Sequence, residues 1–514
     1  MAGADLDVPA KELSISCEAE FKEYPYNKEV DIWTLVTVKA PCHELEESRA
    51  PIDIVAVIDK SGSMSGTKLQ LVKTTMEFVV GQLKSDDRLS IVTYDTNVTL
   101  DFKLMKMTKD NKTSCLEKIR NISSGNSTNL SGGLLKGLEQ MAERQKDKNE
   151  LASVLLFTDG LANHGITSAQ GIIAAMRNPN MFSSPSRSNS ASQAPRHQSW
   201  LQRLHLTKSK EPTEHVEQSS AKEEEKEEEK KEATLPCSVY TFGFGNDHDP
   251  AMLKAISDAG SGMYYFVENE DKISESFGHC LGGLLSTVGQ GIQLNLSAQD
   301  GVKIKEIHVN RSYDLAPDAK SLKVDLGDLQ SEEERDVVLL LTANALPSSL
   351  ETTPQPLIDV EVNYYNVLLE KLANTSTSLG VLRTNIEENS AEKGSVVVNK
   401  QRDRIQTTNA INTATEMADR DDFEAARQVI EQQARSNRSK SYANDEYLCA
   451  LNQDLETCNA MMSSKSVWHK KGKKVQINMA QMHEQQRCSE VDSSERYYKS
   501  RSKAAMGNKF KSPK

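Results

Sequence analysis

The spacing of apolar residues changes along this chain, and each spacing predicts a different kind of element. Residues 12–21 alternate between apolar and polar side chains, which is typical of a half-buried antiparallel strand, and residues 32–38 predict a second strand. From residue 51 onward, continuous apolar runs alternate with segments whose apolar residues follow helical spacing, such as 68–83. That succession predicts a doubly wound, Rossmann-like α/β sheet buried on both faces.

The apolar period returns to two after residue 290. Five candidate strands follow, at residues 292–296, 302–309, 322–326, 337–341 and 357–365. They predict an antiparallel β-sandwich. The two N-terminal strands would be marginally stable alone, so we expect them to join this sandwich, with the α/β domain inserted between its two parts. Helical spacing from residue 395 then predicts a C-terminal helical segment.

These patterns divide the chain into five parts. We expect N-terminal strands of the sandwich at 12–48, the α/β domain at 49–288, the C-terminal part of the sandwich at 289–370, a helical region at 395–463, and a basic, disordered tail at 464–514. Within the α/β domain, residues 178–236 are rich in Ser, Pro, Gln and Lys and include a Glu/Lys run. Such a segment cannot bury enough apolar surface to offset its ordering entropy, so we predict a disordered insertion.

Composition excludes several classes of protein. Apolar residues make up 37% of the 514 residues and aromatic residues 5%, so part of the chain should be solvated. The formal net charge of −12 argues against nucleic-acid binding. No apolar run approaches the ~20 residues of a membrane helix, and the N-terminus lacks a signal-peptide pattern. The eight cysteines lack zinc-ligand spacing. We therefore expect a cytoplasmic protein with reduced thiols and no transmembrane segment.

A candidate site begins where the first apolar run of the α/β domain ends. Residues 52–58 predict a buried strand, and Asp59, Ser61 and Ser63 follow it at alternate positions. Ligands of open α/β sheets bind beyond the carboxyl ends of the strands. One carboxylate with two hydroxyls suits Mg²⁺ or a similar hard cation and does not suit zinc. The glycine and lysine positions exclude a phosphate-binding loop. A plain strand-to-helix turn capped by serine is the alternative that these three residues leave open.

Two later segments complete a pattern. Residues 125–130 precede a helical stretch, and residues 155–160 end a second buried strand in an acid. In this order the segments resemble the metal-ion-dependent adhesion site of von Willebrand factor type A (VWA) domains. The resemblance implies five metal ligands, some acting through water: Asp59, Ser61, Ser63, Thr128 and Asp159. It also implies Mg²⁺, or Mn²⁺ or Ca²⁺, as the cofactor, and a protein partner whose Asp or Glu carboxylate completes the coordination.

The wider plan that these patterns predict is a VWA-like domain within a split sandwich, followed by helices. It resembles intracellular VWA proteins with a Vwaint-type C-terminal region and the non-RING part of plant VWA-containing RING ubiquitin ligases. The sequence holds no Cys/His array that could form a RING. The resemblance therefore implies a non-enzymatic, metal-dependent protein-binding module with a scaffold or adaptor role. The alternative is a component of a ubiquitin ligase-type complex or another enzyme assembly, without a catalytic RING of its own.

Two further hypotheses remain open. Catalysis would need a base, and His164, which follows Asp159 in a loop, is the nearest candidate in the sequence. An extracellular protein similar to the inter-α-inhibitor heavy chains would share the sandwich-plus-VWA plan. The missing signal-peptide pattern and the scattered cysteines count against that second hypothesis.

Overall fold

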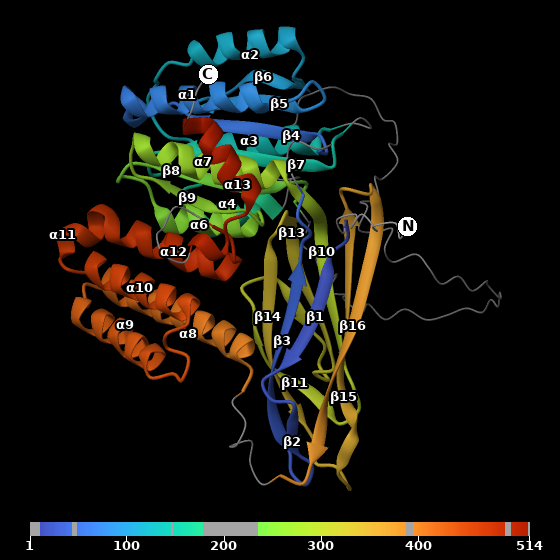
Figure 1. The fold of residues 1–514 in the computed structure, drawn as a ribbon. Coiled ribbons are helices and arrows are strands. Elements are labelled where there is room, and N and C mark those ends of the chain that lie inside the picture. The colour runs from blue at the N-terminus through green and yellow to red at the C-terminus, as the bar shows by residue number, and fades with distance from the viewer. Residues whose placement is uncertain are drawn as a thin grey trace, which may run out of the picture.

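A six-stranded sheet with helices on both faces forms the α/β domain (Figure 1). The computed structural model describes residues 11–43, 49–144, 148–177, 235–386, 394–488 and 495–511. The expected insertion at 178–236 lies, apart from its last two residues, outside the described residues. The strand order is β6-β5-β4-β7-β8-β9, and all neighbours run parallel except β5 and β6. The strands are β4 (Ile52–Asp59), β5 (Arg88–Tyr94), β6 (Val98–Lys106), β7 (Leu151–Thr158), β8 (Ser238–Phe244) and β9 (Tyr264–Val267).

The two central strands are buried along their whole length, which explains their continuous apolar runs. Alternate residues face opposite sides of the sheet: Ile54 belongs to the hydrophobic cluster on one face and Val55 to the cluster on the other. The doubly wound α/β prediction is therefore confirmed. The covering helices are α1 (Thr67–Gln82), α2 (Lys109–Arg120), α3 (Leu130–Ala142), α4 (Ala169–Arg177), α6 (Pro250–Ala259) and α7 (Glu270–Leu285).

Two further sheets lie on one side of the α/β domain (Figure 1), with strand orders β1-β3-β14-β11 and β12-β13-β10-β15-β16-β2. Strand β3 lies between β1 and β14, and Val36 of β3 is opposite Val337 of β14. Buried side chains of both sheets form one hydrophobic cluster. The strands are β1 (Ser14–Ala19), β2 (Glu23–Pro25), β3 (Val30–Lys39), β10 (Thr287–Ala298), β11 (Val302–His308), β12 (Tyr313–Leu315), β13 (Ser321–Gln330), β14 (Glu334–Ala343), β15 (Leu350–Asn366) and β16 (Lys371–Thr384).

Two details of these sheets differ from the prediction. Strand β16 lies wholly after residue 370, where the sequence analysis ended this region. Its side chains are mostly polar, because one face is solvated and the other is only half-buried, so the apolar period is weak. The arrangement is also not wholly antiparallel, since β2 pairs with β16 in parallel over residues 23–25 and 382–384.

The C-terminal helices pack against both of the other parts. The predicted helical segment is confirmed by α8 (Val396–Asp419), α9 (Phe423–Arg438) and α10 (Glu446–Met461). Helix α8 lies against β3 and β14 (Figure 1). Helix α12 (Lys473–Gln485) lies against α6 and β9, where the Gln481 side chain accepts a hydrogen bond from the backbone N–H of Tyr264 at 2.9 Å.

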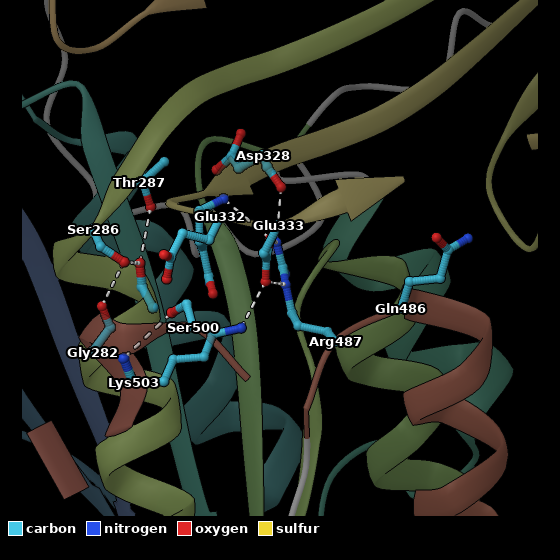
Figure 2. Close-up of polar contacts among 12 residues, drawn as sticks. Gly282, Ser286, Thr287, Asp328, Glu332, Glu333, Gln486, Arg487, Ser500 and Lys503 are labelled. Atoms are coloured by element: carbon cyan, nitrogen blue, oxygen red, sulfur yellow. Dashed lines mark hydrogen bonds and ion pairs between the residues drawn. The ribbon is translucent and has the colours of Figure 1, made fainter. Parts of the chain in front are cut away.

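The prediction of a disordered tail at 464–514 is wrong for most of that segment. Besides α12, it forms α11 (Lys465–Val467), the π-helical turn η4 (Trp468–Gly472), the short helix η5 (Glu495–Tyr497) and α13 (Arg501–Lys511). Trp468 is fully buried, and the basic side chains of Arg487 and Lys503 are buried against Glu333 (Figure 2). Paired cations can be buried, so the high Lys and Arg content did not exclude folding here.

No helix within the described residues has both the length and the hydropathy needed to cross a bilayer.

Candidate metal centre

The first part of the site is the turn that follows β4. Asp59, the last residue of β4, is fully buried. Its Oδ1 accepts a hydrogen bond from the backbone N–H of Ser61 at 2.8 Å, and its Oδ2 accepts one from Thr158 Oγ1 at 2.6 Å. The loop before α3 holds this turn in place, because Gly62 N–H donates to Asn126 O at 2.9 Å. The carboxylate of Asp59 is therefore fixed at the carboxyl edge of the sheet.

The serines and Asp159 meet at that same edge. Ser61 Oγ and Ser63 Oγ lie 3.1 Å apart, and Ser63 Oγ donates to Asp159 Oδ1 at 2.8 Å. Asp159 directly follows β7, which neighbours β4. A methyl group placed on Gly160 would lie 3.5 Å from Ser63 Oγ and 3.6 Å from Thr128 Oγ1, so the hydroxyls of Ser63 and Thr128 border the same space. All five residues implied by the sequence resemblance are thus brought together.

The family model of the von Willebrand factor type A domain matches residues 53–279, which include the whole site. Those residues form a VWA domain. VWA domains are protein-interaction modules, and many of them bind a divalent metal at a metal-ion-dependent adhesion site.

Two curated relatives match part of the chain. The chain is 26% identical to "E3 ubiquitin-protein ligase WAV3" of Arabidopsis thaliana over 299 residues, which are 57% of this chain and 31% of that protein. It is 33% identical to "Inter-alpha-trypsin inhibitor heavy chain H3" of Mus musculus over 133 residues, 25% of this chain and 15% of that protein. The matches thus span less than a third of these curated relatives.

One solved structure resembles nearly the whole chain. The "von Willebrand factor type A from Catenulispora acidiphila" superposes with a TM-score of 0.62 and 12% identity, covering 95% of this chain and 99% of that one. The likeness therefore extends beyond the VWA domain to the two β-sheets and the C-terminal helices. At this identity it shows a shared fold.

Burial sets the electrostatics of the VWA site. It raises the pKa of Asp59 to about 6, and the neighbouring charge of Asp159 adds to that rise. Hydrogen bonds from Thr158 and Ser61 oppose the shift and favour the carboxylate. Two buried carboxylates this close repel each other when both are ionised, and a cation between them would relieve the repulsion.

Lys68 supplies a cation that the sequence analysis did not place in the site. It lies in the first turn of α1, and its Nζ forms an ion pair with Asp159 Oδ2. Burial disfavours the charge of Lys68, but the hydrogen bond and charge of Asp159 outweigh burial, so the pKa of Lys68 is raised. In the sequence, the position of Lys68 excludes a phosphate-binding loop and does not by itself indicate a role in the metal site. The signal that could have placed Lys68 here is its position in the first turn of the helix that follows Ser63.

The donor set fits a hard cation. It consists of two carboxylates and three hydroxyls, and oxygen donors of this kind suit Mg²⁺, Mn²⁺ or Ca²⁺. The described residues include no group of three or more His, Cys, Asp and Glu side chains that could hold a metal, so a zinc-type cluster is absent from that part of the chain. His164 is exposed, and the structure connects it to the site through its backbone N–H, which donates to Thr128 O at 3.2 Å.

Proposed function

We propose that this chain is a metal-ion-dependent protein-binding module with a scaffold or adaptor role. Asp59, Ser61, Ser63, Thr128 and Asp159 would hold Mg²⁺, or Mn²⁺ or Ca²⁺, directly or through water. The bound cation would supply a Lewis-acidic position for a carboxylate. The partner would contribute that carboxylate from an Asp or Glu side chain. The observation that carries the proposal is the hydrogen-bonded convergence of Ser61, Ser63 and Asp159 at the carboxyl edge of β4 and β7.

Binding is favoured over catalysis by the residues around the site. A hydrolytic site would need a general base within hydrogen-bond reach of a bound water. The exposed His164 contributes a backbone N–H at this edge, and Lys68 is an ammonium paired with Asp159. The paired ammonium of Lys68 cannot accept a proton, and the contact of His164 with Thr128 is made by its backbone. A hard cation with fixed hydroxyls suits carboxylate capture.

The test compares wild type with Asp59→Ala in partner capture, with Mg²⁺ and with EDTA. We expect capture of a partner in Mg²⁺ that is lost in EDTA, lost in Asp59→Ala and kept in the control Asp314→Ala, whose exposed carboxylate lies on β12. Replacing one Asp or Glu of the captured partner by its amide should abolish the interaction. Capture that is equal in EDTA and in Asp59→Ala would overturn the proposal.

A second candidate function is a subunit of a ubiquitin ligase-type complex or another enzyme assembly. The similarity to the plant ligase over 57% of this chain favours it. Since the described residues hold no Cys/His metal group, this chain would need a separate catalytic subunit. The test adds a RING ligase and measures ubiquitination of the captured partner. Stimulation by wild type and not by Asp59→Ala would support this role.

We also place the protein in the cytoplasm. Six cysteines are free thiols, and three of these are buried, which suits a reducing compartment: Cys17, Cys115, Cys237, Cys280, Cys449 and Cys458. An exported protein would instead be expected to use some cysteines in disulfides. Fractionation of cells that make the protein, with a secreted control, tests this proposal, and recovery from the medium would contradict it.

A further inference from the structure

Both carboxylate oxygens of Asp159 already have partners on this chain. Oδ1 accepts the hydroxyl of Ser63, and Oδ2 pairs with the ammonium of Lys68. The side chain of Asp159 is fully buried, whereas that of Lys68 is 29% exposed. An ion pair between a lysine and an exposed acid contributes little to folding stability. A buried carboxylate without a counter-charge, in contrast, strongly destabilises the folded state. Lys68 therefore does for Asp159 what a bound cation would do.

Lys68 also has a second carboxylate within reach. Asp247, in the loop after β8, places its Oδ2 3.5 Å from the same Nζ, and its side chain is 76% exposed. Gly245 leaves room for the lysine between the two acids. It has a φ of +67°, and a Cβ there would lie 3.3 Å from Lys68 Cε, tighter than an ordinary contact. The ammonium of Lys68 thus lies within ion-pair distance of both carboxylates, and a short movement would carry it from Asp159 to Asp247.

We propose that Lys68 is a tethered counter-cation that competes with the metal for Asp159. In the metal-free protein the ammonium neutralises Asp159 and keeps the site folded. When a divalent cation binds, repulsion between the two positive charges drives the ammonium to Asp247. Lys68 thereby weakens metal affinity and sets the cation concentration at which the site becomes able to bind a partner. This inference rests on the proposed metal site.

The decisive experiment measures Mg²⁺ affinity of the full chain by calorimetry. We expect Lys68→Met to bind Mg²⁺ about fivefold more tightly than wild type, because a partly exposed competing ion pair is removed. In EDTA, Lys68→Met should melt at a lower temperature than wild type, and saturating Mg²⁺ should remove the difference. The matched control is Lys73→Met, on the same helix, whose Nζ donates to the Arg120 carbonyl at 2.8 Å. It removes the same charge away from the site and should leave the affinity unchanged.

A second variant keeps the test independent of how well Lys68→Met folds. Asp247→Asn changes an exposed side chain and removes the alternative carboxylate for Lys68. Lys68 should then stay on Asp159, and Mg²⁺ should bind more weakly. Its control is Glu268→Gln, which removes a carboxylate just after β9, where Glu268 pairs with Lys471 at 2.7 Å. Glu268→Gln should leave the affinity at the wild-type value.

The outcomes separate this inference from the proposed function. Unchanged affinity in both Lys68→Met and Asp247→Asn, with normal binding by wild type, would overturn the role of Lys68 and leave the metal site standing. Binding by Lys68→Met but not by wild type would support competition by Lys68 and refute metal-dependent binding by the natural protein. If none of the proteins binds Mg²⁺, Mn²⁺ or Ca²⁺, the proposed function and this inference both fail.

Discussion

Arg487 donates two hydrogen bonds to Glu333, from Nε to Oε1 at 2.9 Å and from Nη2 to Oε2 at 3.1 Å (Figure 2). Lys503 Nζ donates to Oε1 and Arg335 Nη2 to Oε2 of the same carboxylate, each at 2.8 Å. Burial alone would raise the pKa of Glu333, but the three cations hold it well below its usual range. One buried carboxylate in the turn between β13 and β14 thus anchors the C-terminal segment from two points along the chain.

Removing that carboxylate charge should strongly destabilise the protein. Glu333→Gln leaves three buried cations without their anion, and we expect it to lower the free energy of unfolding by about 3–5 kcal/mol. The neighbouring change Glu334→Gln is the control, because the Glu334 carboxylate is 45% exposed and pairs with the exposed Lys39. An exposed pair of this kind contributes less than about 1 kcal/mol. Urea unfolding measures both, and equal losses for the two variants would contradict the anchoring role.

Mg²⁺ should stabilise the folded chain through the VWA site. At a free Mg²⁺ concentration about 100-fold above the dissociation constant, the gain in unfolding free energy is about 2.7 kcal/mol. Ser63→Ala removes the hydroxyl that bonds to Asp159 and should abolish most of that gain. Ser65→Ala, an exposed serine two residues further on, should keep it. Melting curves with and without Mg²⁺ test this prediction. An equal rise in melting temperature on adding Mg²⁺ to the two variants would show that Ser63 is not a metal ligand.

A buried histidine should make the VWA domain sensitive to acid. His248 is 3% exposed, and its Nε2 lies 2.6 Å from Tyr264 Oη. Burial, aided by the charges of Lys474 and Lys68, lowers the pKa of His248 from its ordinary 6.5 to about 3. The unfolded chain therefore binds this proton at higher pH than the folded chain does. The stability that neutral His248 contributes is complete above about pH 6.5 and is lost progressively as the pH falls toward about 3.

The variant His248→Gln should reduce that acid sensitivity. Between about pH 7 and about pH 4.5 its melting temperature should fall less than that of wild type, since one proton-linked difference between the folded and unfolded states is gone. His164→Gln, which changes an exposed histidine, should follow the wild-type curve. A His248→Gln profile parallel to wild type would show that other groups dominate acid unfolding.

The sequence carried strong signals where burial is complete. Strands β4 and β7 are apolar throughout because both faces are covered, and their ends placed Asp59 and Asp159 at one edge of a sheet. Strand β16 gave a weak signal, because its polar side chains are those of a strand with one solvated face. Composition alone could not place Lys503 in the core, because its burial depends on Glu333, 170 residues away in the sequence.

The same limit applies to the site. The five oxygen ligands follow strands in a recognisable order, but Lys68 enters the site through an ion pair between α1 and the end of β7. Such a pair depends on how α1 packs over the sheet. Spacing within one segment cannot show it. Tertiary contacts therefore added a cation to a set of ligands that the sequence had already placed together.

The pairing of β3 with β14 predicts that the strands before the VWA domain and those after it need each other. These strands pair over ten residues, from Lys39 opposite Glu334 to Val30 opposite Ala343, and β14 is almost wholly buried. A chain that begins at residue 44 keeps the VWA domain and the helices but leaves β14 with an open apolar edge. Such an edge favours intermolecular pairing, so we expect the shortened chain to bind a hydrophobic dye and to aggregate.

Residues 11–43, added as a separate peptide, should restore a soluble monomer by pairing with that edge. The matched control is the same peptide with Val36→Asp, since Val36 is fully buried opposite Val337 and a carboxylate there would be buried without a partner. Light scattering and dye fluorescence measure the rescue. A shortened chain that stays monomeric and melts at the wild-type temperature would show that β14 is stable without β3. Equal rescue by the two peptides would show that pairing at Val36 does not decide the outcome.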